Sequence, residues 1–381
     1  MRKRMCAILA FFSLLFFAGC TQAEPLDTSA SNTSDTSINN TQETETVNVP
    51  VISKSPLAAV SVPTTTESLI ADNGTVIFEY TYQNMSLTLQ DPDVADKIII
   101  DFLNRIDKTR ELAQTTADSA KYAYDGSENW IPFLYHVVYS PTRIDQGVLS
   151  LFGTNAVYSG TFHPDRSCVS VSYDLTTGDV LTLASIMSTK ASVNDFCKLV
   201  LEGLSEMGEG DYLYENYTET VKDRFSVDPS QDEALFFTQT GLSFYFAPYE
   251  IAPYSSGIIS VEIPYEKLTG LLNDAYFPAE RETPHGSITV QPFENTDPTQ
   301  FSQISEVITD KVGDMYLSYT DGMIQDIRII INDEKNSYTV FAAYELSVGD
   351  GIMIQISEDK IGTVSVCYKS EDERIATPLI P

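Results

Sequence analysis

Apolar positions that alternate with polar ones mark the first folded region of the chain. Apolar side chains recur at every second residue through much of the stretch from Val76 to Leu89, which is typical of strands with one buried face. Asp91 and Pro92 follow, and this pair predicts a helix N-cap with proline at the first helical position. The apolar face expected for that helix consists of Val94, Ile98, Phe102 and Ile106.

A broad apolar stripe predicts the clearest helix of the chain, over residues 193–207. Helices and antiparallel-looking strands are mixed here without the regular alternation that a parallel sheet requires. The expected fold for residues 63–279 is therefore α+β, an antiparallel sheet with packed helices. The other elements expected are strands within 130–173, 234–247 and 257–263 and a short helix at 266–275.

The C-terminal part of the chain carries a different pattern. Short apolar runs are separated by Gly, Asp and Asn turns, with hairpin-type signals at Asp321-Gly322 and Asp350-Gly351. This pattern predicts a small all-β sandwich or barrel over residues 286–381, with one helix around 303–312. A charged run bracketed by prolines and a glycine, at residues 279–286, is the expected boundary between the two domains.

The first residues predict export. Three basic residues at positions 2–4 precede an apolar run, 7–18, that is too short for a bilayer-spanning helix of about 20 residues. The run ends in Phe17-Ala18-Gly19-Cys20, which resembles a bacterial lipoprotein box except that Phe17 replaces the usual aliphatic residue. Residues 1–19 are thus expected to be a signal peptide. Lipid on Cys20 would hold the protein at the extracytoplasmic face of the cell membrane. An ordinary signal peptide with an unrelated cysteine is the alternative.

Residues 20–62 are rich in Ser, Thr and Asn and contain no aromatic side chain. Such a segment cannot bury enough apolar surface to offset the entropy lost on ordering, so a disordered tether is expected. The first dependable strand is expected at Thr75. A lipid anchor followed by a polar stalk is the arrangement that displays a domain on a cell surface.

Charge narrows the range of partners. The formal net charge is −31, and loss of the signal peptide, which has three basic and no acidic residues, makes it −34. Nucleic acid is not an expected partner, because its binding depends on Lys and Arg, whereas a basic protein would be attracted. Beyond Cys20 the chain keeps Cys168, Cys197 and Cys367, so at most one disulfide is possible within it, and the sequence does not show which.

The stretch FYFAPYEIAPYSSG, residues 244–257, contains the candidate ligand-binding residues. Proline cannot donate to a strand ladder, so the preceding strand should end near Phe246. The stiff aromatic loop that follows has two interpretations. It could pack against the fold, or it could present Tyr249, Glu250 and Tyr254 to a ligand at little entropic cost.

Three segments in this order resemble the extracellular domain of RsiV-type anti-sigma factors. They are the stretch 172–183 with Tyr-Asp-Leu-Thr-Thr-Gly-Asp-Val-Leu at its centre, the Pro-Tyr segment 244–265, and, more weakly, the stretch 158–164 with Ser-Gly and a histidine. The resemblance covers roughly residues 70–277 and implies an α+β fold with helices on an antiparallel sheet. In that family the domain is a receptor for lysozyme, and the same domain accompanies some peptidoglycan deacetylases. This chain shows neither the sigma-factor-binding segment nor the membrane span of those regulators, so their signalling role is not expected here.

Motifs for catalysis, metal binding or cofactor binding are absent from the sequence, including His-Glu-x-x-His, Cys-x-x-Cys pairs and phosphate-binding glycine loops. The favoured hypothesis is a non-catalytic surface lipoprotein that binds a protein, lysozyme being one candidate, or a wall-derived ligand, without a cofactor. An enzyme acting on cell-wall glycan through Glu250, Asp174 and His163 is the alternative. A purely structural envelope component is the third hypothesis.

Overall fold

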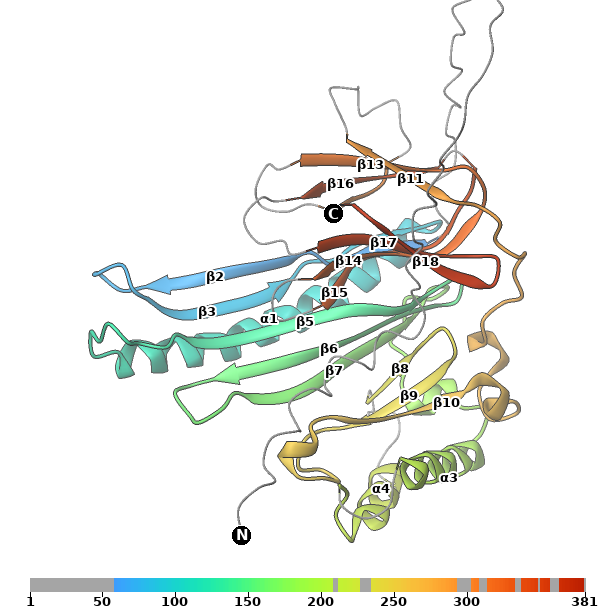
Figure 1. Cartoon of the computed structure of the whole chain (residues 1–381). Helices are drawn as coiled ribbons and strands as arrows, with labels where there is room; N and C mark the ends of the chain where they lie inside the picture. Colours follow the sequence, from blue (N-terminus) through green and yellow to red (C-terminus); the bar gives the residue numbers. More distant parts are fainter. Residues whose placement is uncertain are drawn as a thin grey trace, which may run out of the picture.

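The computed structural model describes residues 58–207, 212–226, 234–292, 303–307, 314–332, 337–348, 350–356 and 363–379. Its helices and antiparallel sheets confirm the α+β class predicted from the sequence (Figure 1). Residues 1–57 lie outside the described residues, and with them the predicted signal peptide, Cys20 and most of the predicted tether. Among the residues described, no helix is both long and apolar enough to cross a membrane.

A five-stranded sheet, in the order β2-β3-β5-β6-β7, forms the centre of the first region. The strands are β2 (Thr64–Ile70), β3 (Val76–Gln83), β5 (Phe133–Ile144), β6 (Val148–Tyr158) and β7 (Asp165–Asp174). All neighbours are antiparallel except β3 and β5, which are parallel because helix α1 (Pro92–Ala123) lies between them in the chain. Its N-cap is Asp91, as predicted, and its apolar stripe packs on one face of the sheet.

A smaller sheet, in the order β10-β9-β8, packs on the other face of the five-stranded sheet, where β8 contacts β6 and β7. Its strands are β8 (Leu235–Phe237), β9 (Gly241–Phe246) and β10 (Ile259–Pro264), and it is covered by α2 (Leu183–Ile186), α3 (Lys190–Glu206) and α4 (Tyr217–Ser226). The α3 helix confirms the stripe predicted over 193–207. The short helix predicted at 266–275 is instead two 3₁₀ turns, η3 (Tyr265–Leu268) and η4 (Asp274–Tyr276), after a first such turn η2 (Tyr254–Ser256).

Two sheets face each other in the C-terminal region, which is the predicted sandwich. One has the order β11-β13-β16-β12 and the other β18-β17-β14-β15-β1-β4, and a shared core of isoleucine and valine side chains lies between them. The strands are β1 (Ala58–Ser61), β4 (Ser86–Leu89), β11 (Ile288–Pro292), β12 (Gln303–Val307), β13 (Asp314–Thr320), β14 (Ile324–Asn332), β15 (Ser337–Leu346), β16 (Gly351–Ile356), β17 (Thr363–Ser370) and β18 (Glu373–Pro378).

Three expectations about this part of the chain need correction. The tether does not extend to residue 62, because residues 58–61 form β1 between β4 and β15. The sequence Ala-Ala-Val-Ser has little strand character of its own and becomes a strand through pairing with a distant segment. Residues 303–307 of the helix expected at 303–312 form strand β12, and 308–312 lie outside the described residues. The sandwich is also not built from residues 286–381 alone, since β1 and β4 complete one of its sheets.

The segment 279–286, which is the expected domain boundary, contacts the sandwich through Arg281. Arg281 forms an ion pair with Asp326 at 3.1 Å and stacks on the Tyr344 ring. Farther away, Arg328 donates to the carbonyl oxygens of Pro141 and Thr142, at 3.0 and 2.8 Å, and so joins β14 to β5. The two regions therefore contact each other through polar side chains as well as through a common sheet.

Candidate functional site

The Pro-Tyr loop begins with a tight turn that holds Tyr249 in an uncommon conformation. The amide of Glu250 donates to the carbonyl of Ala247 at 3.1 Å, and Pro248 and Tyr249 occupy the two central positions. Tyr249 has φ of 71°, the left-handed value that the third position of a type II turn requires and that glycine usually supplies. Its side chain is 62 % exposed, so the ring does not gain burial in return for this conformation.

Glu250 stabilises this turn through both of its carboxylate oxygens. One oxygen pairs with the guanidinium of Arg224 on α4, and the other accepts the amide of Ala247 at 2.8 Å. The Arg224 guanidinium also lies over the Phe244 ring. Glu250 therefore holds the loop in place, and its direct contact with a ligand stays a prediction.

Tyr254 connects the loop to the hairpin between β6 and β7. Its hydroxyl donates to the carbonyl of Pro164, and its ring stacks on His163 with centroids 4.3 Å apart. Tyr249 also lies against Tyr254, with the ring centroids 5.5 Å apart. The segment 158–164 and the Pro-Tyr segment, which the resemblance singled out separately, therefore meet in space.

Other exposed aromatic side chains surround this contact. Phe162, at the hairpin tip, is fully exposed, and Tyr212 and Tyr214 are exposed on the segment before α4. This segment lies next to the loop, since the Tyr214 amide donates to the carbonyl of Ile251 at 2.9 Å. We call the following set the aromatic surface: Phe162, His163, Tyr212, Tyr214, Tyr249 and Tyr254.

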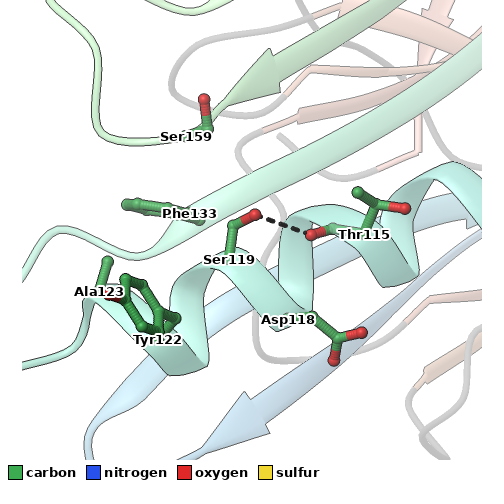
Figure 2. A pocket seen from close by; sticks show the side chains of 7 residues that line it. All are labelled: Thr115, Asp118, Ser119, Tyr122, Ala123, Phe133 and Ser159. Atoms are coloured by element: carbon green, nitrogen blue, oxygen red, sulfur yellow. Dashed lines mark hydrogen bonds between the residues drawn. The ribbon is translucent and has the colours of Figure 1, made fainter.

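A shallow groove of about 550 Å³ borders the same hairpin (Figure 2). Two of its polar side chains are already engaged: Asp118 accepts from Lys121 at 3.2 Å, and Ser119 donates to the carbonyl of Thr115 at 3.0 Å. The Asp118 carboxylate also points away from Phe133 and Ser159 (Figure 2). Since its polar groups do not converge, we assign no ligand to this groove. The lining residues are Thr115, Asp118, Ser119, Tyr122, Ala123, Phe133 and Ser159.

The three residues of the glycan-hydrolysing alternative do not come together. His163 lies just before the start of β7 and Asp174 at its end, so the 10 residues of the strand separate them by about 30 Å. Asp174 instead accepts hydrogen bonds from Thr176 and Thr177 within its own turn. Within the described ranges, no three His, Cys, Asp or Glu side chains are grouped so that they could hold a metal ion.

No two of Cys168, Cys197 and Cys367 are joined in a disulfide in this structure. Burial raises the pKa of the Cys168 thiol to about 12, which leaves it protonated and unreactive at neutral pH.

A buried ion pair, which sequence reasoning missed, supports the small sheet. Arg143, at the end of β5, is 1 % exposed and binds Asp145 with its Nε atom 2.6 Å from Oδ2. Its Nη1 atom donates to the Tyr265 hydroxyl and to the carbonyl of Tyr276, at 2.6 and 2.7 Å. Burial raises the pKa of Tyr265 to about 12. The sequence signal that could have identified this pair is an arginine and an aspartate two residues apart at the end of an apolar strand.

Comparison with known proteins places the Pro-Tyr loop within a recognised domain. Residues 188–266 match the family described as "Protein of unknown function (DUF3298)". This match runs from α3 to η3 and includes Tyr249, Glu250 and Tyr254. This part of the chain is therefore similar to DUF3298 domains.

Solved structures of the same family are similar to this chain. A DUF3298-family protein from Bacteroides fragilis is 15 % identical, with 58 % of this chain and 96 % of that chain covered and a TM-score of 0.40. One from Pseudomonas aeruginosa is also 15 % identical, with 61 % and 100 % covered and a TM-score of 0.38. A comparison with curated proteins found no match.

Proposed function

We propose that this protein is a non-catalytic binding protein whose aromatic surface contacts a protein or a cell-wall-derived ligand. The observation that carries this proposal is the conformation of Tyr249. A left-handed conformation costs a non-glycine residue about 1–2 kcal/mol, and a tyrosine with a 62 % exposed ring recovers little of that by packing. Strained backbone conformations of this kind cluster at active sites, ligand-binding segments and switch regions.

The neighbouring residues support presentation of a rigid surface. Glu250 and Arg224 fix the turn, and the ring of Tyr254 is held by its stacking on His163 and its contact with Tyr249. Little conformational entropy remains to be lost on binding, and tyrosine is a residue type enriched in the central contacts of protein interfaces.

The ligand class follows from the family resemblance and from charge. The DUF3298 domain also occurs in RsiV, whose extracellular domain is a lysozyme receptor. A chain with net charge −31 would attract a strongly basic protein of that kind. Lysozyme is therefore the first candidate partner, and a soluble peptidoglycan fragment is the second. Lipid on Cys20 would present the domain outside the membrane, in envelope sensing or maintenance.

Binding measurements with matched variants test this proposal. Purified chain from residue 21 onward is titrated with lysozyme and with soluble peptidoglycan fragments, and any fragment turnover is followed by mass spectrometry. Tyr249→Ala should weaken binding at least about tenfold, as expected for a central aromatic contact. Leu112→Ala, an exposed apolar position on α1 (58 % exposed), is the control and should leave binding unchanged. An unchanged affinity of the Tyr249→Ala variant, or turnover of the fragments, would contradict the proposed function.

A further inference from the structure

Strand β1 occupies a closed slot between two parts of the fold. It pairs antiparallel with β4, where Val60 lies opposite Leu87, and antiparallel with β15, where Val60 lies opposite Ala342. Every residue from Ala58 to Val62 is at most 3 % exposed. A four-residue strand with both edges paired and both faces covered is an internal element of the fold.

The side chains of this strand enter two different cores. Ala58, Val60 and Val62 pack with α1 and the five-stranded sheet, and Ala59 packs in the core of the C-terminal sandwich. The side chains of β15 likewise divide between these two cores. The sheet formed by β1, β4 and β15 is thus a layer common to both halves.

The residue after the strand is held by both halves as well. The amide of Val62 donates to the carbonyl of Val340, at 2.9 Å, and its carbonyl accepts from Gln83 Nε2 at 2.8 Å. Gln83 is fully buried, and its amide also bonds the carbonyl and the amide of Tyr139, at 3.0 and 2.5 Å. One side chain therefore connects the end of β1 to β5.

We propose that residues 58–62 are a clasp strand, which fills a strand-binding slot between β4 and β15 and thereby holds the C-terminal sandwich against the α+β half. The slot selects an extended segment with small residues at 58 and 59 and a β-branched apolar residue at 60. The clasp strand begins at the first residue that the structure describes. Withdrawal of the strand exposes an unpaired edge on β15 and loosens the two halves from one another.

The first experiment compares two full-length variants by hydrogen exchange. Val60→Asp places a carboxylate in the apolar core and should speed exchange at residues 341–343 of β15 by at least about tenfold relative to residues 149–151 of β6. Ser68→Asp, on an exposed position of β2, is the control and should change neither. Equal acceleration in both segments would show that β1 has no specific role at the joint, and unchanged exchange at 341–343 would also overturn the proposal.

A second full-length variant guards against global unfolding. Val60→Ala keeps an apolar side chain in the slot and should speed exchange at 341–343 less than Val60→Asp does, again without a matching change at 149–151. Equal acceleration of both segments, or no acceleration at 341–343, would contradict a specific role of β1 at the joint.

Discussion

Replacing Arg143 with methionine should lower the free energy of unfolding by more than the removal of any exposed charged side chain in the described part of the structure. Arg143→Met keeps most of the volume but leaves Asp145, which is 3 % exposed, without its cation. It also removes the donors to the Tyr265 hydroxyl and the Tyr276 carbonyl, at 2.6 and 2.7 Å. Breaking a buried pair by removing one partner costs about 3–5 kcal/mol. We expect the free energy of unfolding to fall by that amount.

Urea denaturation measures this loss, with fluorescence from Trp130 as the signal because it is the chain's single tryptophan and stacks on Phe133 in the core. Lys121→Met, which removes an exposed pair with Asp118, is the control and should change stability by less than about 0.5 kcal/mol. The double variant Arg143→Met/Asp145→Asn should recover at least about 1 kcal/mol, since asparagine removes the unpaired charge and keeps the oxygen that accepts from Gly147 and Val148. A loss below about 1 kcal/mol for Arg143→Met, or no recovery in the double variant, would refute the reasoning.

Three further predictions follow from single features. Gly153→Ala should strongly destabilise the protein in thermal unfolding, because its Cβ atom would lie 2.0 Å from the carbonyl oxygen of Val138 in the neighbouring strand; an unchanged Tm would contradict this close approach. Cys20→Ser should abolish lipidation and move the protein from the membrane fraction to the medium, or leave the signal peptide uncleaved, as read by fractionation and mass spectrometry; unchanged mass and retention would exclude the anchor. Binding of lysozyme should persist at ~0.5 M salt with a slower on-rate and a similar off-rate, because contacts of the aromatic surface remain after salt screens the long-range electrostatic attraction. Equal binding of another basic protein would show that electrostatic attraction alone, without a specific contact, accounts for the binding.

Sequence periodicity predicted the elements that have amphipathic patterns of their own. The stripe around Phe196 became α3, and Asp91 with Pro92 began α1 as expected. The α1 helix continues to Ala123, beyond its predicted apolar face, because alanines at 113, 117 and 120 carry the buried side. Small residues contribute little to a hydrophobic pattern, and this also explains why β1 was assigned to the tether.

The sequence predicted which segments form the candidate site but not how their side chains are arranged in space. Proline and tyrosine spacing identified the loop, and the resemblance identified the segment that contains His163. The pairing of Glu250 with Arg224 depends on α4 lying next to the loop, and no local pattern around either residue encodes that contact. The same holds for Arg143, whose partners Tyr265 and Tyr276 lie more than a hundred residues away in the chain.

The most direct test of the central claim is one variant, Tyr249→Gly, measured for both stability and binding. Glycine adopts the left-handed conformation without the cost of about 1–2 kcal/mol, and offsets part of this gain with the roughly 0.5–1 kcal/mol of chain entropy that it loses on folding. If the ring serves a ligand, urea denaturation should show a free energy of unfolding that is unchanged or up to about 1.5 kcal/mol higher, while affinity for the ligand falls at least about tenfold. If the ring serves the fold, stability should fall by more than about 1 kcal/mol with affinity unchanged, and that result would contradict the proposed function.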